Sequence, residues 1–342
     1  MYIKENLNTT MDQTAKEIDF SGVIMASDTV TLNYESAYGF ANRSDEIKNT
    51  TGTRFGIASG CKLFTAIGIC MLVEQGKLTF QTRLKDCLSA PFSSFHDEIT
   101  VHHLLTHSSG IPDYFDEAVM DDFSELWNER PMYKMNRLRD FLPMFQDREM
   151  MFWPGEKFHY NNAAYIVLGL IIEEQSGLTF TDYIEKNVFK KAGMFESGYF
   201  SLDQLPKNTA IGYIDDEEEE NWKTNIYSIP VKGGADGGAF VTAGDMIKLL
   251  DALFSFELLN EDTTKQLLTP HMEEDEGEYY GYGIWIDKSD SEIEKYHLMG
   301  YDPGVSFHAA YYPKRSVKLI VVSNKSKGAY GMMRAFEEDF VE

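Results

Sequence analysis

Cysteine is scarce in this sequence, with three residues in 342, which excludes a disulfide framework. Cys61, Cys70 and Cys87 are an odd number without paired metal-ligand spacing, so we expect free thiols in a reducing compartment. Long apolar runs are missing as well, since none reaches the roughly 20 residues that a membrane-spanning helix needs. The first twenty residues also lack the apolar segment of a secretory signal, so we expect a cytoplasmic protein.

Positive charge is also in short supply. The chain has 31 Lys and Arg against 55 Asp and Glu, a formal net charge of -24. Nucleic acid binding needs clustered basic residues, and an anionic membrane surface attracts them too, so neither partner is expected. A content of 43% hydrophobic and 25% charged residues is typical of a folded globular protein with a sizeable core. The acidic stretch IDDEEEENWK, residues 214–223, is expected to be a solvated loop.

Strands are predicted at both ends of the chain and helices between them. Residues 20–43 alternate apolar and polar positions about a polar break, which predicts a β-hairpin. Residues 305–324 predict two strands joined by a Pro-Lys-Arg-Ser turn, and the last eleven residues predict a helix. Most of residues 120–195 is predicted to be helical, including 162–175, and a capped helix is predicted from near Thr242. The economical arrangement is one sheet built from both ends of the chain, with a helical region inserted.

A serine and a lysine crowd the start of an apolar helix predicted within residues 55–80. Residues three apart share a helix face, so Ser59 and Lys62 should point toward one place. The helix N-terminus carries positive partial charge and free N–H groups, which would stabilise an alkoxide and an oxyanion. The alternative is that Ser59 only caps the helix and Lys62 is a surface residue. Cys61 points about 200° away from Ser59 and is expected to be a packing residue.

Two other segments carry groups with possible chemistry. Tyr160 and Asn162 lie just before an apolar helix. A phenol near a lysine loses its proton more easily than a free phenol. A carboxamide can orient a substrate carbonyl or hold the lysine in place. Alternatively, Asn162 caps that helix and Tyr160 packs. Gly300 and Gly304 flank a tight turn, where glycine lets a backbone N–H approach a reacting carbonyl. The alternative is a simple turn between strands.

Taken together, these segments resemble the serine β-lactamase and penicillin-binding-protein family, in particular class C β-lactamases and the related D-amino-acid peptidases and esterases. Ser59-Gly60-Cys61-Lys62 resembles the motif Ser-x-x-Lys, and Tyr160-Asn161-Asn162 resembles Tyr-x-Asn. The segments HHLLTHSSGIPDY, GYGIWID and GGAFVTAGDM resemble further landmarks in the expected order. The resemblance extends from about Phe20 to Ser323.

The resemblance implies a mixed α/β (α+β) fold, with an antiparallel sheet flanked by helices and an inserted helical region. Residues 1–19 would be an N-terminal extension, and residues 20–342 a single catalytic domain. Its sheet lobe would comprise about residues 20–95 and 235–342, and its helical lobe about residues 96–234.

The resemblance also implies acyl transfer from a small-molecule substrate through a covalent intermediate, without metal or organic cofactor. Ser59 would attack the carbonyl, with Lys62 and Tyr160 sharing the role of general base and Tyr160 returning the proton to the leaving group. Asn162 would bind Lys62 and the substrate amide oxygen. The backbone N–H groups of Ser59 and of Tyr301, which follows Gly300, would hold the oxyanion.

The third motif departs from the family pattern of Lys-Thr-Gly or His-x-Gly. Leu298 occupies the place of the cation, and His297 lies one step out of register, which on a strand means the opposite face. This favours an esterase, amidase or peptidase over an efficient β-lactamase; the alternative function is a catalytically silent ligand-binding or sensor protein. The cluster of His102, His103 and His107 lacks the glutamate of His-Glu-x-x-His, so a zinc site is not expected and His107 should make structural hydrogen bonds.

Overall fold

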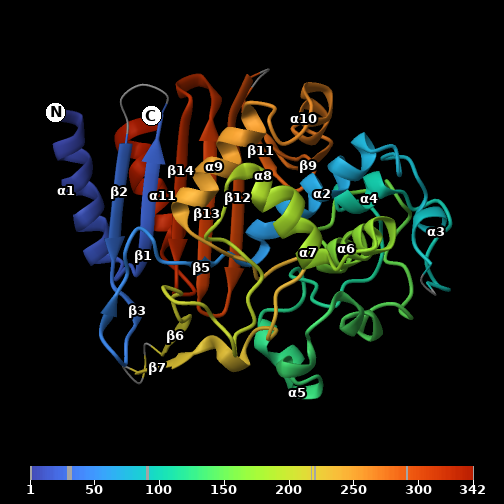
Figure 1. Cartoon of the computed structure of the whole chain (residues 1–342), viewed down its shortest axis with the longest axis horizontal. Helices are drawn as coiled ribbons and strands as arrows, with labels where there is room; N and C mark the ends of the chain where they lie inside the picture. The colour runs from blue at the N-terminus through green and yellow to red at the C-terminus, as the bar shows by residue number, and fades with distance from the viewer. Residues whose placement is uncertain are drawn as a thin grey trace.

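An antiparallel sheet forms the centre of the molecule (Figure 1). The computed structural model describes residues 2–28, 33–89, 92–216, 218, 221–289 and 292–341, and within them eight strands follow the order β2-β1-β14-β13-β12-β11-β10-β9. The strands are β1 Gly22–Ser27, β2 Asn33–Tyr38, β9 Met272–Asp275, β10 Glu278–Tyr280, β11 Trp285–Ser289, β12 Glu292–Asp302, β13 Val305–Tyr312 and β14 Val317–Ser323.

The two ends of the chain meet in this sheet. Strand β1 pairs with β14, with Gly22 opposite Ser323, and β1 also pairs with β2 as the predicted N-terminal hairpin. Strands β13 and β14 form the predicted C-terminal pair. Nearly every residue of these two strands is buried, because helices cover both faces of the sheet. The mixed fold and the sheet built from both ends are therefore confirmed.

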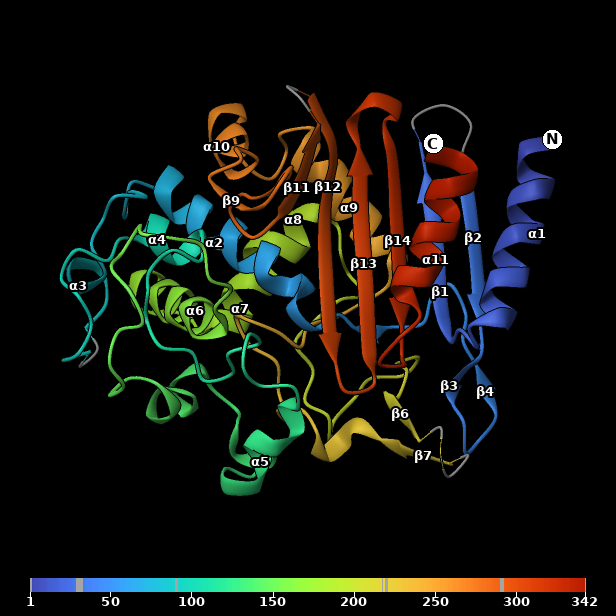
Figure 2. The same ribbon diagram turned by 180° about the vertical axis from the view of Figure 1, so that it is seen from behind.

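Helices α1 (Tyr2–Glu17) and α11 (Ala329–Phe336) cover one face of the sheet (Figure 2). Leu7, Met11 and Ala15 of α1 are buried in the same core as residues of β14 and α11. The first nineteen residues, expected as an extension, thus include a helix that shares a core with the sheet. The predicted C-terminal helix is confirmed by α11.

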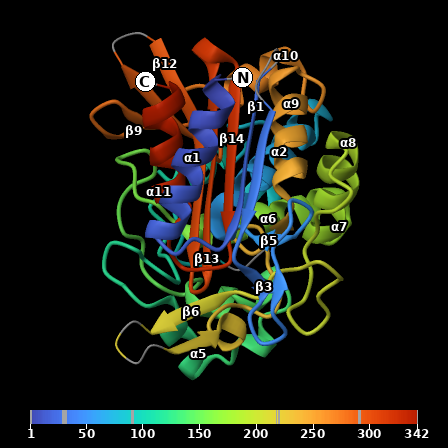
Figure 3. The same cartoon turned by 90° about the vertical axis from the view of Figure 1, so that its left-hand side faces the viewer.

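The other face packs against α9 and the inserted helical region (Figure 3). Helix α2 runs through the largest core with most of its side chains buried, as its nearly uniform apolar sequence predicts. Helix α9 begins after Thr242, whose hydroxyl accepts the N–H of Asp245, and α6 ends at Gly177 with a φ of 72°. Both predicted helices are confirmed. The remaining α-helices of the described residues are α2 Lys62–Glu74, α3 Leu84–Cys87, α4 Val101–Leu105, α5 Leu126–Glu129, α6 Asn162–Ser176, α7 Phe180–Ile184, α8 Lys190–Ala192, α9 Ala243–Phe254 and α10 Glu261–Leu267.

Two sequence predictions were wrong in part: the helical prediction for residues 120–195 holds only in its second half, and the loop prediction for the acidic stretch fails at its two ends. The segment between Met120 and Tyr160 is not mostly helical: it contains the single turn α5 and several short 3-10 turns joined by loops. The acidic stretch is not a simple loop either, because β6 (Tyr213–Asp216) and β7 (Asn221–Thr224) pair as a hairpin, although residues 217, 219 and 220 of that stretch lie outside the described residues.

Three short strand pairs surround the sheet: β3 (Phe40–Asn42) with β4 (Ile47–Lys48), β5 (Phe55–Gly56) with β8 (Phe240–Val241), and β6 with β7. Among the described residues, no helix combines the length and the hydrophobicity required to cross a bilayer.

Candidate active site

Ser59 lies in a 3-10 turn, Ala58–Cys61, that leads directly into α2. Ala58 has a φ of 45°, a left-handed conformation that a residue with a Cβ adopts only under constraint from its surroundings. The Lys62 Nζ donates a hydrogen bond to Ser59 Oγ at 2.9 Å, so the two side chains converge as their spacing predicted. Ser59 is partly exposed, whereas Lys62 is 2% exposed and therefore requires partners inside the protein.

Lys62 has those partners in two distant segments. Its Nζ donates to Asn162 Oδ1 at 2.8 Å and to the backbone carbonyl of Asp236 at 2.8 Å. The sequence identified the contact with Asn162 but gave no indication of Asp236, which lies 174 residues away from Lys62. The three acceptors account for all three protons that a charged lysine can donate.

Tyr160 lies beside this lysine, with the Lys62 Nζ 4.9 Å from the centroid of its ring. Burial, followed by the negative charge of Glu117, raises the pKa of Tyr160 well above its ordinary value, while a hydrogen bond with Ser59 acts in the opposite direction. The sequence-based expectation that Lys62 would ease the ionisation of Tyr160 is therefore not met. In this arrangement the phenol keeps its proton.

The start of α6 is fixed by a network of buried polar groups. Asn161 caps the helix by accepting the N–H of Ala164, and Asn162 is the first helical residue. The carboxylate of Asp113 accepts the N–H groups of Asn162 at 2.6 Å and of Ala163 at 2.9 Å. Burial raises the pKa of Asp113 to about 7, although these backbone hydrogen bonds favour the ionised form. Asp113 was not identified from the sequence as a site residue.

Strand β12 passes close to the turn that carries Ser59. A Cβ atom added at Gly300 would lie 2.1 Å from the carbonyl oxygen of Ile57 and 3.0 Å from the backbone nitrogen of Ser59. Strand β11 pairs with β12 only as far as His297, which leaves the edge of residues 298–302 free on that side. Glycine at position 300 thus allows the backbone of β12 to approach Ser59, as the third motif predicted.

His297 and Leu298 lie on opposite faces of β12. Leu298 is 3% exposed and belongs to the large core beneath the helical region. His297 is also buried, and its Nε2 lies 2.9 Å from Asp287 Oδ1. Neither side chain lines the cavity at Ser59, whereas Tyr301 does.

A cavity of about 790 Å³ has Ser59 and Asn162 in its wall. The charged residues that line it are Glu117, Asp121, Asp122, Asp236 and Asp302 together with Lys223 and Lys232. Asp236 Oδ2 accepts a hydrogen bond from the Tyr114 hydroxyl, whereas no hydrogen bond or ion pair to the Asp302 carboxylate occurs within the described part of the chain. Burial, followed by the charge of Asp236, raises the pKa of Asp302 to about 8.

The carboxyl groups of the cavity were missed by the sequence analysis. Asp236 stands alone among the glycines of GGADGGAF, and Asp302 follows Gly300 by two positions. Asp236 and Asp302 each lie next to a recognised motif, and this position in the sequence is the signal by which they could have been identified as site residues.

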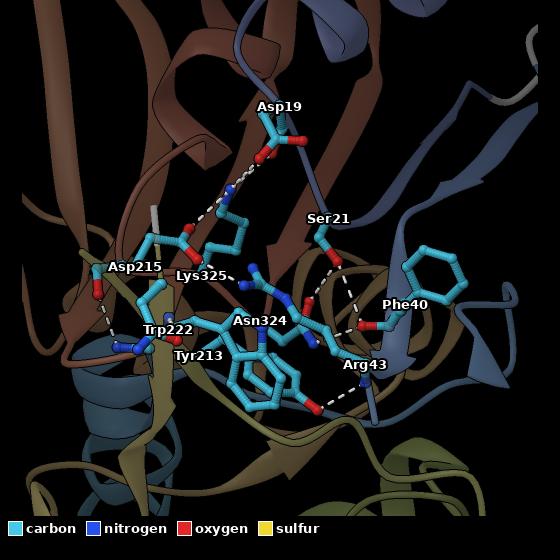
Figure 4. Close-up of polar contacts among 12 residues, drawn as sticks. Asp19, Ser21, Phe40, Arg43, Tyr213, Asp215, Trp222, Asn324 and Lys325 are labelled. Carbon is cyan, nitrogen blue, oxygen red and sulfur yellow. Dashed lines mark hydrogen bonds and ion pairs between the residues drawn. The ribbon is translucent and has the colours of Figure 1, made fainter. Parts of the chain in front are cut away.

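The β6–β7 hairpin and its flanks form the outer wall of this cavity, and a polar cluster anchors them to the sheet (Figure 4). Asp215 of β6 pairs with Arg43 Nη1 at 2.6 Å and with Lys325 Nζ at 2.8 Å. Lys325 also pairs with Asp19, and the Arg43 guanidinium stacks on the Tyr213 ring. The acidic stretch thus has a structural role at Asp215, which two partly buried cations hold.

Cys61, the alternative nucleophile, and the histidines considered as metal ligands are less well placed for catalysis than Ser59. Cys61 is fully buried, and burial raises the pKa of its thiol to about 12. His102 Nδ1 contacts the Tyr282 hydroxyl, and His103 Nδ1 accepts the N–H of Thr100. Within the described residues, three potential metal ligands lie close together: Glu278, Asp287 and His297. Asp287 already pairs with both His297 and Lys295, so its carboxylate is engaged within the protein.

Comparison with known proteins assigns this geometry to a family. The sequence matches the family model described as Beta-lactamase over residues 7–340. The chain belongs to the beta-lactamase family. It is 27% identical over 338 residues to "Penicillin-binding protein 4*" of Bacillus subtilis (strain 168), a match that covers 95% of this chain and 72% of that protein.

Solved structures superpose on nearly the whole length of the chain. A penicillin binding protein from Bacillus halodurans is 55% identical, with a TM-score of 0.93 and coverage of 96% of this chain and 100% of that one. A D-amino acid amidase from Ochrobactrum anthropi SV3, complexed with L-phenylalanine amide, is 19% identical, covers 100% of this chain and 99% of that one, and shares the fold with a TM-score of 0.82. The expected family and fold are therefore confirmed, and membership of this family supports a hydrolase.

Proposed function

We propose that this protein is a serine hydrolase that transfers the acyl group of a small ester or amide to Ser59 and then to water. The observation that carries the proposal is the set of hydrogen bonds around Lys62. Asn162 Oδ1 and the Asp236 carbonyl can only accept, so they hold two N–H bonds of Lys62 in either protonation state. A neutral Lys62 would therefore direct its lone pair at Ser59 Oγ, 2.9 Å away, and could take the hydroxyl proton.

The remaining steps use the neighbours of this pair. As Ser59 Oγ bonds to the substrate carbonyl carbon, its proton passes to Lys62, and the carbonyl oxygen becomes negative between the N–H groups of Ser59 and Tyr301. The leaving group then departs with a proton from the Tyr160 phenol, whose raised pKa keeps that proton available, and Lys62 reprotonates Tyr160. Water hydrolyses the acyl-enzyme by the reverse route.

The charges around the cavity favour an uncharged or positively charged substrate. Neither Leu298 nor His297 lines the cavity, and His297 is already paired with Asp287, so these two positions of β12 offer a substrate carboxylate no cation. Acidic residues outnumber basic ones in the cavity wall, with Glu117, Asp121, Asp122, Asp236 and Asp302 against Lys223 and Lys232. An acyl group with an ammonium, as in the amides hydrolysed by a D-amino acid amidase, would be compatible with them.

Labelling with a fluorophosphonate, followed by mass spectrometry, tests the nucleophile. The adduct should map to Ser59, and Ser59→Ala should abolish both labelling and turnover without unfolding the protein. Cys61→Ala is the matched control and should keep both. An adduct on another residue, or an unlabelled wild-type protein, would contradict the proposal.

A substrate panel tests the preference. Loss of a charge-assisted contact of roughly 1.5–3 kcal/mol corresponds to about a 10- to 100-fold decrease in kcat/KM. We therefore expect p-nitrophenyl butyrate and D-amino-acid amides to give a higher kcat/KM than nitrocefin, which carries a carboxylate. More efficient hydrolysis of nitrocefin than of every uncharged ester would refute the assigned preference while leaving Ser59 as the nucleophile.

A further inference from the structure

His107 is fully buried and has an unusual backbone conformation. Its φ is 56°, in the left-handed region that residues other than glycine rarely occupy, although His, Asn and Asp do so more often than most. Such conformations persist when the surrounding structure requires them. The residue follows α4 and lies in the segment THSSG, for which the proposed reaction gives no role.

Both hydrogen bonds of His107 to the neighbouring loop reach the residues that flank Tyr160. Its backbone carbonyl accepts the N–H of His159 at 2.9 Å, and its imidazole Nδ1 accepts the N–H of Asn161 at 3.0 Å. One residue thus fixes the backbone on each side of the phenol. Because Asn161 caps α6 and Asn162 accepts from Lys62, this anchoring also positions the lysine's partner.

The imidazole ring also packs directly on the phenol. The ring centroids of His107 and Tyr160 are 4.5 Å apart, and the rings of Tyr165 and Tyr280 lie within 5.0 Å and 4.7 Å of the same imidazole. An Nδ1 that accepts an N–H must be unprotonated, so the neutral ring carries its proton on Nε2. Burial, together with the charge of Lys62, lowers the pKa of His107 well below its ordinary value, which agrees with this neutral form.

We infer that His107 is a positioning residue for Tyr160: it holds the phenol against Ser59 and Lys62 through the two flanking N–H groups and through ring packing. The inference rests on the proposed function of Ser59 and Tyr160. It predicts that loss of the Nδ1 acceptor lowers kcat, because misplacement by about 1 Å can cost on the order of 100-fold in rate, and leaves substrate binding nearly unchanged.

Three substitutions at His107 distinguish the contribution of its hydrogen-bond acceptor from that of its ring packing. His107→Phe keeps the ring and removes the acceptor; we expect kcat for p-nitrophenyl butyrate to fall about 10- to 100-fold with KM changed less than threefold. His107→Asn places Oδ1 where Nδ1 was and tolerates a positive φ, so kcat should recover to within about fivefold of wild type. His107→Gln carries the same amide one methylene further out, so it should resemble Phe, and it replaces Phe if that variant does not fold.

A double-mutant cycle with Tyr160→Phe tests whether His107 acts through the phenol. The effect of His107→Phe, or of His107→Gln, should shrink to less than threefold when the Tyr160 hydroxyl is absent. Folded Phe and Gln variants with wild-type kcat, equal losses in Asn and Gln variants, or an undiminished effect in the cycle would each overturn the inference.

A measurement without turnover separates this inference from the proposed reaction. Imidazole nitrogen NMR of the wild-type protein should show His107 neutral, with the proton on Nε2, from pH 5 to 9. A protonated Nδ1 would refute the positioning geometry even in an active enzyme. Absence of Ser59-dependent turnover in the wild type would refute the reaction, and with it the positioning role.

Discussion

Replacement of Gly300 by alanine should nearly abolish activity while the protein remains folded. The new Cβ would lie 2.1 Å from the Ile57 carbonyl oxygen, 2.9 Å from the Gly60 nitrogen and 3.0 Å from the Ser59 nitrogen. All three are backbone atoms, so no side chain can rotate away. Ordinary contact begins at 3.4 Å, and β12 must therefore move away from the Ser59 turn by more than about 1 Å.

This displacement would widen the space between the N–H groups proposed to hold the oxyanion. Loss of one such donor typically costs about 100- to 1,000-fold in kcat, and we expect a decrease of that size for Gly300→Ala. Overpacking should lower the free energy of unfolding by about 1–3 kcal/mol. Gly244→Ala is the matched control, because a Cβ at Gly244 meets no atom within 4 Å.

The assay combines kcat and KM for p-nitrophenyl butyrate with the rate of fluorophosphonate labelling and with thermal unfolding. Both the turnover and the labelling of Gly300→Ala should be slow, because both develop negative charge at the same oxygen position. A folded Gly300→Ala variant with kcat within threefold of wild type would refute the role given to the approach of β12 to Ser59.

Two other side chains give predictions that depend on pH. For Asp302, burial and the charge of Asp236 raise the pKa to about 8, so the carboxyl group is mostly neutral at pH 7 and mostly ionised at pH 9. The ratio of kcat/KM for acetylthiocholine to kcat/KM for its uncharged carbon analogue should therefore rise several-fold between these pH values. The substitution Asp302→Asn should remove this rise. For Asp215, burial acts to raise the pKa, but Arg43 and Lys325 outweigh it and hold the pKa below 3.8, so the ion pairs stabilise the folded protein above that pH and the effect is lost in more acidic solution. Asp215→Asn should therefore lower Tm by a few degrees at pH 7 and by less at pH 3, and an equal decrease at both would contradict this assignment.

The strands could be predicted from the sequence because their signal is local. The alternation in residues 20–43 and the apolar runs of β13 and β14 reflect which side chains are buried on the sheet. This pattern can be read from neighbouring residues, without knowing which distant segments pack against them. The segment from Met120 to Tyr160 carries no such signal. Its short turns depend on distant contacts, such as the hydrogen bonds from Arg148 to the Asp113 carbonyl and from Trp127 to the Ser228 carbonyl.

The same distinction applies to the site. Ser59 and Lys62 converge because three positions along a helical turn bring side chains together, a relation that the sequence contains directly. The cap of α6 by Asn161 is local as well, although the sequence pointed to Asn162 as the alternative cap. Asp236 reaches Lys62 only through the tertiary fold, and no spacing rule connects residues 174 positions apart. The raised pKa of Tyr160 likewise depends on burial and on Glu117, which lies on a different loop.

The third motif lacks a cation, and carboxyl groups line the cavity, so the site should disfavour a negatively charged substrate. Lys62 is the buried cation at the nucleophile, whereas Asp113, Asp236 and Asp302 are carboxyl groups whose pKa values are all raised, mainly by burial. Leu298 lies in the core and supplies no cation to the cavity, so a bound carboxylate would add negative charge to a region in which carboxyl groups already resist ionisation. A bound ammonium would instead favour ionisation of Asp302 and lower the cost of its burial. Asp236 therefore both lines the cavity that receives the substrate and holds Lys62 through its backbone carbonyl, so a displacement of this residue should alter the substrate preference and the position of Lys62 together.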